Sequence, residues 1–226
     1  VPEIKQIAIT TGGGDAPGLN AVIRAVVLSA LGRGWRCVGI REGYNGLLEP
    51  DDYPEGGVIN ITRESVMGIT HLGGTILGTT SRGNPVSYPV RMEDGVVFEE
   101  DRTEELVEAF RSHEIDAVVA IGGDGSLSIA KVLAEKGLRI VGVPKTIDND
   151  LPLPGGQPTF GFETVRQAGT EAMLNLMEEA RTTNRWYFIV VMGREAGHLA
   201  LGIAKAAGAT LALIPEEFPE GGPTLD

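Results

Sequence analysis

Two aspartates, a threonine and a lysine stand close together in the stretch VPKTIDND, residues 143–150. The stretch follows the apolar run RIVGV (139–143), which is typical of a buried strand. A carboxylate at the mouth of a strand can take a proton from a substrate hydroxyl when a nearby cation keeps it ionised. Asp148 and Asp150 are therefore candidates for acid–base chemistry. The alternative is an Asx-turn network that only holds the loop.

Many of the 32 glycines gather in short clusters instead of spreading as a linker would: TTGGGDAPG, HLGGTILG, IGGDG and LPGGQ. Glycine lets the backbone approach a ligand closely, and a glycine-rich turn that opens a helix presents N–H groups to an anion. The first cluster has neither the lysine of a P-loop nor the dinucleotide-binding fingerprint. It therefore predicts an anion site of another kind.

Asp124 in GGDGS and Arg194 in MGREAGH extend this chemistry. A carboxylate beside a phosphate cradle would repel the ligand, so a bridging Mg²⁺ held by Asp124 is the economical explanation. The alternative is that Asp124 caps a helix beginning at Ser126. Arg194 can stabilise negative charge on a transferring phosphoryl group. Together these groups predict phosphoryl transfer without a covalent enzyme intermediate.

Apolar, β-branched runs alternate with helical patterns, which indicates an α/β fold with mostly parallel sheets and helices on both faces. The expected strands are 6–10, 36–40, 116–122, 139–143, 188–193 and 210–215. The expected helices are 17–33, 102–113, 126–136, 161–181 and 197–207. Residues 82–101 carry two prolines and mixed charge, so we interpret them as a surface excursion.

The stretch LPLPGGQP (151–158) predicts a boundary between two domains, 1–150 and 151–226. Ligands of an open parallel sheet bind beyond the carboxyl ends of its strands. Five unusual sequences are expected at such ends: GGGDAPG, GGTILGTTSRGNP, GGDGS, PKTIDND and MGREAGH. So many polar loops at strand ends are more than packing requires, and they indicate a ligand site.

The bulk composition excludes several classes of protein. A net charge of −12 argues against a non-specific binder of nucleic acid or of an anionic membrane. The single Cys37 excludes an internal disulfide and fits a reducing cytosol, where we expect an inert buried thiol. No apolar run reaches 18 residues and no signal-peptide pattern begins the chain, so we expect a soluble intracellular protein.

The motifs TGGGDAPGLNAVIRA, EGYNGL, GGTILGTTSRG, IGGDGS, PKTIDND and VVMGREAGHLA stand in the order seen in the 6-phosphofructokinase family. The chain resembles this family from about Lys5 to Glu216. The resemblance implies two Rossmann-like α/β domains and a cytoplasmic homodimer or homotetramer with active sites shared between subunits. It also implies phosphorylation of the 1-hydroxyl of fructose 6-phosphate. Because family chains continue further, this one looks like an N-terminal portion with an incomplete second domain.

The resemblance also implies roles for single residues. Asp148 matches the catalytic base, Thr146 a contact to the sugar, and Asp150 a second carboxylate near the metal or the transferring phosphate. The positions that match the donor site are Gly14, Arg82, Gly123, Asp124 (the Mg²⁺ ligand), Gly125 and Ser126. The positions that match the segment touching fructose 6-phosphate and the phosphoryl group are Met192, Gly193 and Arg194. Arg185 matches an arginine that reaches the sugar phosphate of a neighbouring subunit, with an ordinary surface arginine as the alternative.

Gly125 and Lys145 give opposite indications about the phosphoryl donor. Family members that use pyrophosphate resemble GGDD at 122–125, where an aspartate fills the space of the nucleotide α-phosphate. Gly125 leaves that space open, whereas Lys145 resembles pyrophosphate users or is only a surface charge. Because the steric block is the stronger criterion, ATP is the predicted donor and pyrophosphate the alternative.

A non-catalytic binding or regulatory subunit of the same fold is the second alternative. The intact set Asp124, Thr146, Asp148 and Arg194 argues against it, since such a subunit has no reason to keep all four.

Overall fold

The structure is a computed structural model that describes residues 3–91 and 95–218. The chain divides into two compact units, Val1–Lys145 and Thr146–Asp226. The division falls near the end of a strand and before the proline-rich stretch at 151–158. The assignment of donor and sugar functions to domains 1–150 and 151–226 remains a prediction.

The first unit alternates strands and helices. Its strands are β1 (Gln6–Thr11), β2 (Arg36–Ile40), β3 (Val58–Asn60), β4 (Tyr88–Arg91), β5 (Val97–Glu100), β6 (Ala117–Gly122) and β7 (Ile140–Thr146), the last crossing the division. Its α-helices are α1 (Leu19–Leu31), α2 (Asn45–Leu48), α3 (Thr103–Ser112) and α4 (Asp124–Glu135). The first four expected strands and the first three expected helices are confirmed, with ends that differ by a few residues.

The main sheet of this unit has the order β3-β2-β1-β6-β7. β1 pairs in parallel with β2 and with β6, and β6 pairs in parallel with β7, whereas β3 is antiparallel to β2. The register places Thr11 beside Ile121 and Gly122 beside Pro144. The loops that follow β1 and β6 therefore leave the sheet at the same end, the carboxyl end of its parallel strands.

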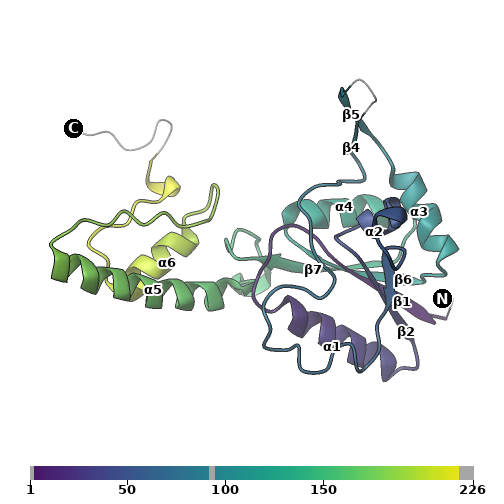
Figure 1. Cartoon of the computed structure of the whole chain (residues 1–226), viewed down its shortest axis with the longest axis horizontal. Coiled ribbons are helices and arrows are strands. Elements are labelled where there is room, and N and C mark those ends of the chain that lie inside the picture. The colour runs from purple at the N-terminus through teal and green to yellow at the C-terminus, as the bar shows by residue number, and fades with distance from the viewer. Residues whose placement is uncertain (1–2, 92–94, 219–226) are drawn as a thin grey trace. The chain divides into compact units, whose positions relative to one another are not determined.

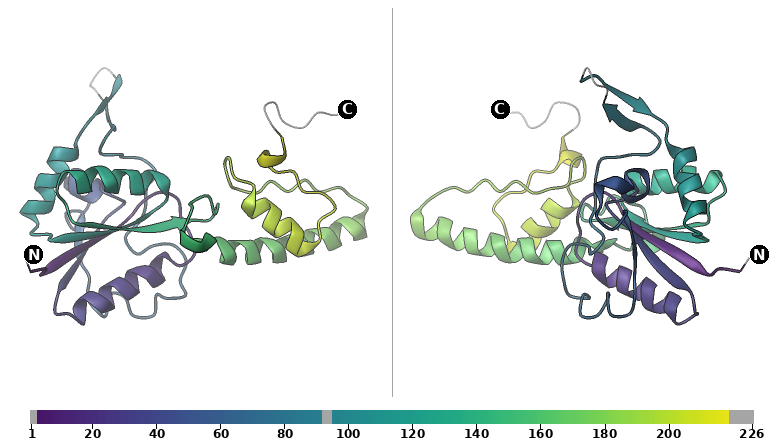
Figure 2. Two further views of the ribbon diagram at one scale, coloured as in Figure 1. Left: turned by 180° about the vertical axis from the view of Figure 1, so that it is seen from behind. Right: turned by 45° about the vertical axis from the view of Figure 1, so that its right-hand side comes forward.

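Helices cover both faces of this sheet, as expected for a mostly parallel α/β sheet. α1 lies on one face, while α3 and α4 lie on the other (Figure 1; Figure 2). α1 buries Leu19, Ile23, Val27 and Ala30, whose spacing of three or four residues forms one apolar stripe. On the other face, Phe110 of α3 and Leu133 of α4 are completely buried against the sheet.

Residues 82–101 contain a short antiparallel hairpin of β4 and β5, which projects from the unit (Figure 1). All four residues of β5 are exposed, which agrees with the interpretation as a surface excursion. Arg102, just after the hairpin, stacks over the Tyr88 ring at 4.6 Å. It also pairs with Glu105 at 2.7 Å and with Glu49. This arginine therefore ties the base of the hairpin to α2 and α3.

The second unit contains the two-residue strand β8 (Phe160–Gly161), the long helix α5 (Phe162–Thr183) and the helix α6 (His198–Ala207). The helices at 161–181 and 197–207 are thus confirmed. α5 and α6 pack on each other through a small core made of Phe162, Met173, Leu199, Ile203 and Ala207. Among the described residues, no helix is both long and apolar enough to cross a bilayer.

The expected strands at 188–193 and 210–215 are wrong: neither segment forms a strand. A strand needs a neighbour for its backbone N–H and C=O groups, and these two segments have no ladder partner within the described residues. Their apolar side chains are correspondingly exposed, with Phe188 at 91% and Val190 at 96%. Both segments are rich in apolar residues, but apolar composition alone does not supply a pairing partner.

Candidate functional site

Two glycine-rich loops leave β1 and β6, the central strands of the first unit. β1 is followed by α1 and β2 on one side, and β6 by α4 and β7 on the other, so the strand order reverses between them. Ligands of open α/β sheets bind at such a switch point. The residues there are Gly12–Gly14 after β1 and Gly123–Ser126 after β6. Three of the five expected loops thus follow strands, whereas GGTILGTTSRGNP and MGREAGH do not.

Backbone hydrogen bonds fix the first loop. Gly12 N donates to Ile121 O at 2.9 Å and Gly13 N to Thr80 O at 2.8 Å. Thr79 Oγ1 donates to Gly13 O at 2.6 Å. Gly13 has φ 81°, a left-handed conformation that glycine adopts without steric cost. The loop therefore has a defined shape, and Gly14 at its tip has open space around the position of a Cβ.

The Ser126 side chain packs between the two glycine-rich loops. A Cβ on Gly12 would lie 2.7 Å from Ser126 Oγ, and one on Gly122 would lie 2.3 Å from Ser126 Cβ. Both glycines are therefore required by packing. Ser126, predicted as a donor contact, also determines how closely the loops approach each other.

Asp124 and Gly125 are exposed in the first turn of α4. The helix begins at Asp124, and within the described part of the chain the Asp124 carboxylate has no hydrogen-bond partner, so the capping alternative lacks support. No group of three or more His, Cys, Asp or Glu among the described residues could hold a metal ion. Mg²⁺ typically takes one or two carboxylates and fills its octahedron with phosphate oxygens and water. The single carboxylate of Asp124 is enough for that mode of binding.

Gly125 differs from the packed glycines because nothing lies within 4 Å of the position of its Cβ. Its φ is not left-handed either. Neither space nor backbone conformation requires a glycine here, and glycine costs up to about 1 kcal/mol relative to alanine in a helix. The absence of a side chain therefore needs a reason outside the fold.

Arg82 is exposed at the end of the loop 72–83. Asn20 of α1, 2% exposed, holds that loop: its Nδ2 donates to Leu72 O and Gly73 O at 3.2 Å, and its Oδ1 accepts from Ile76 N at 2.9 Å. Arg82 N donates to Thr80 Oγ1 at 3.0 Å. The backbone under Arg82 is thus held while its guanidinium remains exposed.

Lys145 is buried, with 5% of the residue exposed, so the interpretation as a mere surface charge is wrong. Its Nζ donates a hydrogen bond to Gly14 O and lies 3.5 Å from the position of a Cβ on Gly13. A buried ammonium group needs such polar partners. Lys145 therefore brings positive charge to the tip of the first glycine loop.

The second unit begins with the residues that follow Lys145. Thr146 and Asp148 are both 8% exposed. Asp148 N donates to Thr146 Oγ1 at 3.0 Å, and Thr159 Oγ1 donates to Thr146 O at 2.7 Å. Thr159 is itself 2% exposed. These two bonds fix the backbone that carries the Asp148 carboxylate.

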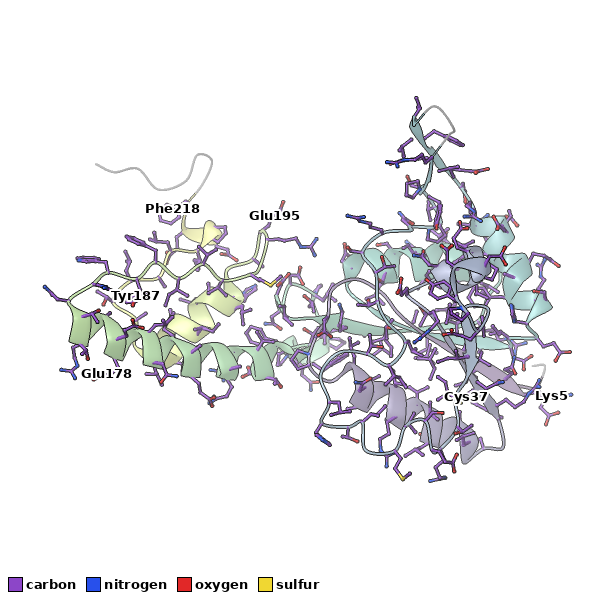
Figure 3. The ribbon with its side chains drawn as sticks, in the orientation of Figure 1. Lys5, Cys37, Glu178, Tyr187, Glu195 and Phe218 are labelled. Carbon is purple, nitrogen blue, oxygen red and sulfur yellow. The ribbon has the colours of Figure 1, made fainter. Side chains whose placement is uncertain are left out.

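Arg194 is the cation beside that carboxylate. Its Nε lies 4.0 Å from Asp148 Oδ2, and its side chain is 84% exposed. Gly193 is required before it, because a Cβ there would lie 2.2 Å from Ala196 O. Ala196 N donates to Gly193 O at 2.8 Å and closes the turn. Figure 3 shows Glu195 at this turn, in the loop that leads into α6.

The loop of Arg194 is also held from its other side. Gly197 N, at the start of α6, donates to Glu216 Oε1 at 2.8 Å. This hydrogen bond lowers the pKa of the Glu216 carboxyl below its usual value. A Cβ on Gly197 would lie 2.4 Å from Ile214 Cβ, so glycine is required for this close approach.

Comparison with known proteins identifies the family of the chain. The family model described as phosphofructokinase matches residues 6–221. The chain belongs to the phosphofructokinase family. A pyrophosphate–fructose 6-phosphate 1-phosphotransferase of Thermotoga maritima is 45% identical over 220 residues, covering 96% of this chain and 49% of that protein. An ATP-dependent 6-phosphofructokinase 1 of Synechocystis is 44% identical over 216 residues, covering 95% and 57%.

The fold agrees with this family. The phosphofructokinase from Saccharomyces cerevisiae matches 91% of this chain and 28% of its own with a TM-score of 0.71 and 32% identity. The chain spans about half the length of the curated relatives named above, 49% and 57%.

Within the second unit, the phosphofructokinase chain brings together Thr146, Asp148 and Arg194. Asp150 is exposed and has no hydrogen bond within the described residues. Met192 is 74% exposed, two residues before Arg194.

Arg185 follows the C-terminal end of α5, whose 22 residues span about 33 Å at 1.5 Å per residue. Thr146 is bonded to Thr159, which lies just before the start of the same helix. Arg185 and the Asp148 loop are thus associated with opposite ends of α5. Figure 3 shows Tyr187 on the segment that runs back along the helix.

Two residues that hold the site were missed from the sequence, Thr159 and Asn20. Both are buried polar residues that bond backbone groups of another segment: Asn20 bonds the loop 72–83, and Thr159 bonds Thr146 at the end of β7. The only signal for Asn20 is a polar side chain on the apolar stripe of its helix. Thr159 carries no comparable signal, because its partner Thr146 is identified only by the fold.

Proposed function

We propose that this phosphofructokinase chain is part of a glycolytic enzyme that transfers the γ-phosphoryl group of ATP to the 1-hydroxyl of fructose 6-phosphate, giving fructose 1,6-bisphosphate. The observation that carries the proposal is the Asp148 carboxylate, which is buried, held through Thr146 and 4.0 Å from Arg194 Nε. A carboxylate held beside a cation stays ionised and can accept a hydroxyl proton.

In the reaction, the sugar oxygen attacks the γ-phosphorus, its proton passes to Asp148, and the bond to the ADP oxygen breaks. Asp148 is the general base, and Thr146 orients the sugar beside it. Arg194 offers its exposed guanidinium to the negative charge on the transferring group. Met192 and Gly193 form the sugar-facing backbone before Arg194, and Asp150 acts as a second carboxylate near the phosphate.

The donor groups lie in the first unit. Gly14, Gly123 and Ser126 supply backbone and hydroxyl contacts to the phosphates, and Arg82 adds a guanidinium. Mg²⁺ would be held by Asp124 and, when bound, would neutralise charge on the phosphate oxygens. As a metal ligand, the Asp124 carboxylate would no longer repel the phosphates, because the cation would offset its negative charge.

ATP is the donor that Gly125 favours, because the open space at its Cβ position can receive a nucleotide phosphate. Pyrophosphate is the second candidate, and Lys145 favours it. A buried ammonium at the tip of the Gly14 loop adds charge suited to a small, highly charged anion. The relatives named above include one enzyme of each kind.

The assembly is proposed to be a homodimer or homotetramer with shared sites. Arg185 supports this proposal by its place in the second unit. It follows the C-terminal end of α5, whereas the Asp148 loop is tied to the segment before the N-terminal end, and the helix between them is about 33 Å long. Its guanidinium is better suited to the sugar phosphate of a neighbouring subunit. A cytoplasmic location is proposed with it, since the buried, unpaired Cys37 suits a reducing compartment.

The donor is tested with the full-length protein that contains this chain, assayed with fructose 6-phosphate, Mg²⁺ and either ATP or pyrophosphate. The proposal expects fructose 1,6-bisphosphate with ATP at a kcat/KM at least tenfold above that with pyrophosphate. The reverse preference would make pyrophosphate the donor and Lys145 the residue that indicates it. Tight binding of both substrates without turnover would favour the non-catalytic subunit.

A further inference from the structure

The backbone is left-handed between the two aspartates of TIDND. Asn149 has φ 56°, in the left-handed region, while Asp148 is buried and Asp150 is exposed. In an extended segment, residues two apart point to the same side. The left-handed residue between Asp148 and Asp150 breaks that alternation, which allows the two carboxylates to have different environments.

This conformation has a cost that depends on the side chain. A Cβ in the left-handed region lies too close to the following carbonyl, whereas glycine has no such penalty and asparagine tolerates the region better than most side chains. The Asn149 side chain makes no hydrogen bond within the described residues and is only half-buried. Its identity is thus explained by the backbone it permits, and not by a contact.

Asp148, the proposed base, is the residue directly before Asn149. The Asp148 N–H bonds to Thr146 Oγ1, and the carboxylate then points to within 4.0 Å of Arg194 Nε. Arg194 is itself left-handed, with φ 50°. Asn149, which follows Asp148, and Arg194 thus both have backbone conformations that most side chains disfavour, and such conformations persist where the surrounding structure holds them.

We propose that Asn149 is a positioning residue: its left-handed backbone conformation, and not its side chain, holds the Asp148 carboxylate beside Arg194. The inference rests on the proposed function, because it assigns Asn149 to the transfer step of the same site.

The test compares Asn149→Gly, Asn149→Ala and Asn149→Val in the full-length protein. Asn149→Gly keeps the left-handed backbone and should retain at least about half of kcat. Asn149→Ala should lower kcat about tenfold and Asn149→Val further, with the KM for fructose 6-phosphate changed less than threefold. Equal losses in the glycine and alanine variants would assign the role to the side chain and overturn the proposal, as would an unchanged kcat in Asn149→Ala.

Glu114 offers a matched control, since it is left-handed with φ 54° in the turn after α3, in the first unit. Glu114→Ala should lower the melting temperature without changing kcat. Crystal structures of the Asn149 variants give a readout independent of turnover. The separation of Asp148 Oδ2 and Arg194 Nε should persist in Asn149→Gly and change in Asn149→Ala. If the wild-type protein turns over neither donor, the proposed function fails while this distance still tests the positioning.

Discussion

Asp148 Oδ2 and Arg194 Nε lie 4.0 Å apart, with the carboxylate buried and the guanidinium 84% exposed. An ion pair with one partner in water contributes only about 0–1 kcal/mol to stability. The arrangement is therefore poorly explained as a device for holding the fold. It is well explained as a base with a cation beside it, where that cation still faces an incoming anion.

Variants of Gly125 test whether the open space at its Cβ position receives a nucleotide phosphate. Gly125→Ala should raise the free energy of unfolding by up to about 1 kcal/mol, because the space is empty and alanine is the better helix residue. The same change should lower kcat/KM for ATP. Gly125→Asp should lower it at least about tenfold, because a second negative charge beside Asp124 repels the nucleotide phosphates.

Gly122→Ala is the matched control for the two Gly125 variants, because Gly122 is a glycine that packing requires. Its Cβ would lie 2.3 Å from Ser126 Cβ, so Gly122→Ala should destabilise the protein. Chemical denaturation and donor kinetics measure both effects. ATP turnover by Gly125→Asp at the wild-type rate would contradict the steric account of donor choice.

Thr159 tests the hydrogen bond that holds the end of β7. Thr159→Val removes the Oγ1 donor and leaves the buried Thr146 carbonyl unsatisfied, which should cost about 1–3 kcal/mol of stability. kcat should fall as well, because Thr146 holds Asp148. Thr159→Ser keeps the hydroxyl and should restore most of both quantities. Equal stability and kcat in the valine variant and the wild type would remove this role.

Much of the fold follows from hydrophobic patterning, whereas the contacts that hold the site do not. Alternating apolar strands and amphipathic helices predict β1, β2 and β6 because most of their side chains are buried within the first unit. The strand β7 is predicted as well, and it pairs with β6 although its Val141 is 63% exposed. The same reasoning fails at 188–193 and 210–215, where strand formation depends on a partner and not on composition.

The candidate site was predicted in the same uneven way. Short motifs identify Asp148, Thr146 and Arg194, and the structure places them together. The burial of Lys145 and the bond from Thr159 could not be predicted, because each depends on a contact between residues far apart in the sequence or across a loop. The left-handed conformation of Asn149 is local, yet asparagine adopts several conformations in turns and its presence alone does not specify one.

The Asp116 carboxyl group should contribute to the pH dependence of the free energy of unfolding. Its carboxylate accepts hydrogen bonds from the backbone N–H groups of Lys5 at 2.7 Å and Gln6 at 2.9 Å, which lower its pKa below the usual 3.8. Because the folded pKa is the lower one, this stabilisation is present above about pH 4 and is lost as the pH falls through the folded pKa. Asp116→Asn should be less stable than the wild type at pH 6, and the difference should shrink toward pH 3. A difference that stays constant with pH would contradict the assignment.

Cys37 should be chemically inert in the folded protein. The residue is 3% exposed, and burial raises the pKa of its thiol to about 11. Very little thiolate is then present at pH 8, and reagents reach it only on unfolding. Mass spectrometry after iodoacetamide treatment should find no label on native protein and one label in denaturant. Rapid labelling of native protein would show that the thiol is accessible.

The kcat of Asp148→Ser in the full-length protein, with ATP, Mg²⁺ and fructose 6-phosphate, tests the central claim most directly. Loss of the general base should lower kcat by about 10²–10⁴-fold. The melting temperature should change little, because the ion pair with Arg194 contributes little to stability. A kcat within a few-fold of the wild type, in a folded variant, would contradict the assignment of Asp148 as the base.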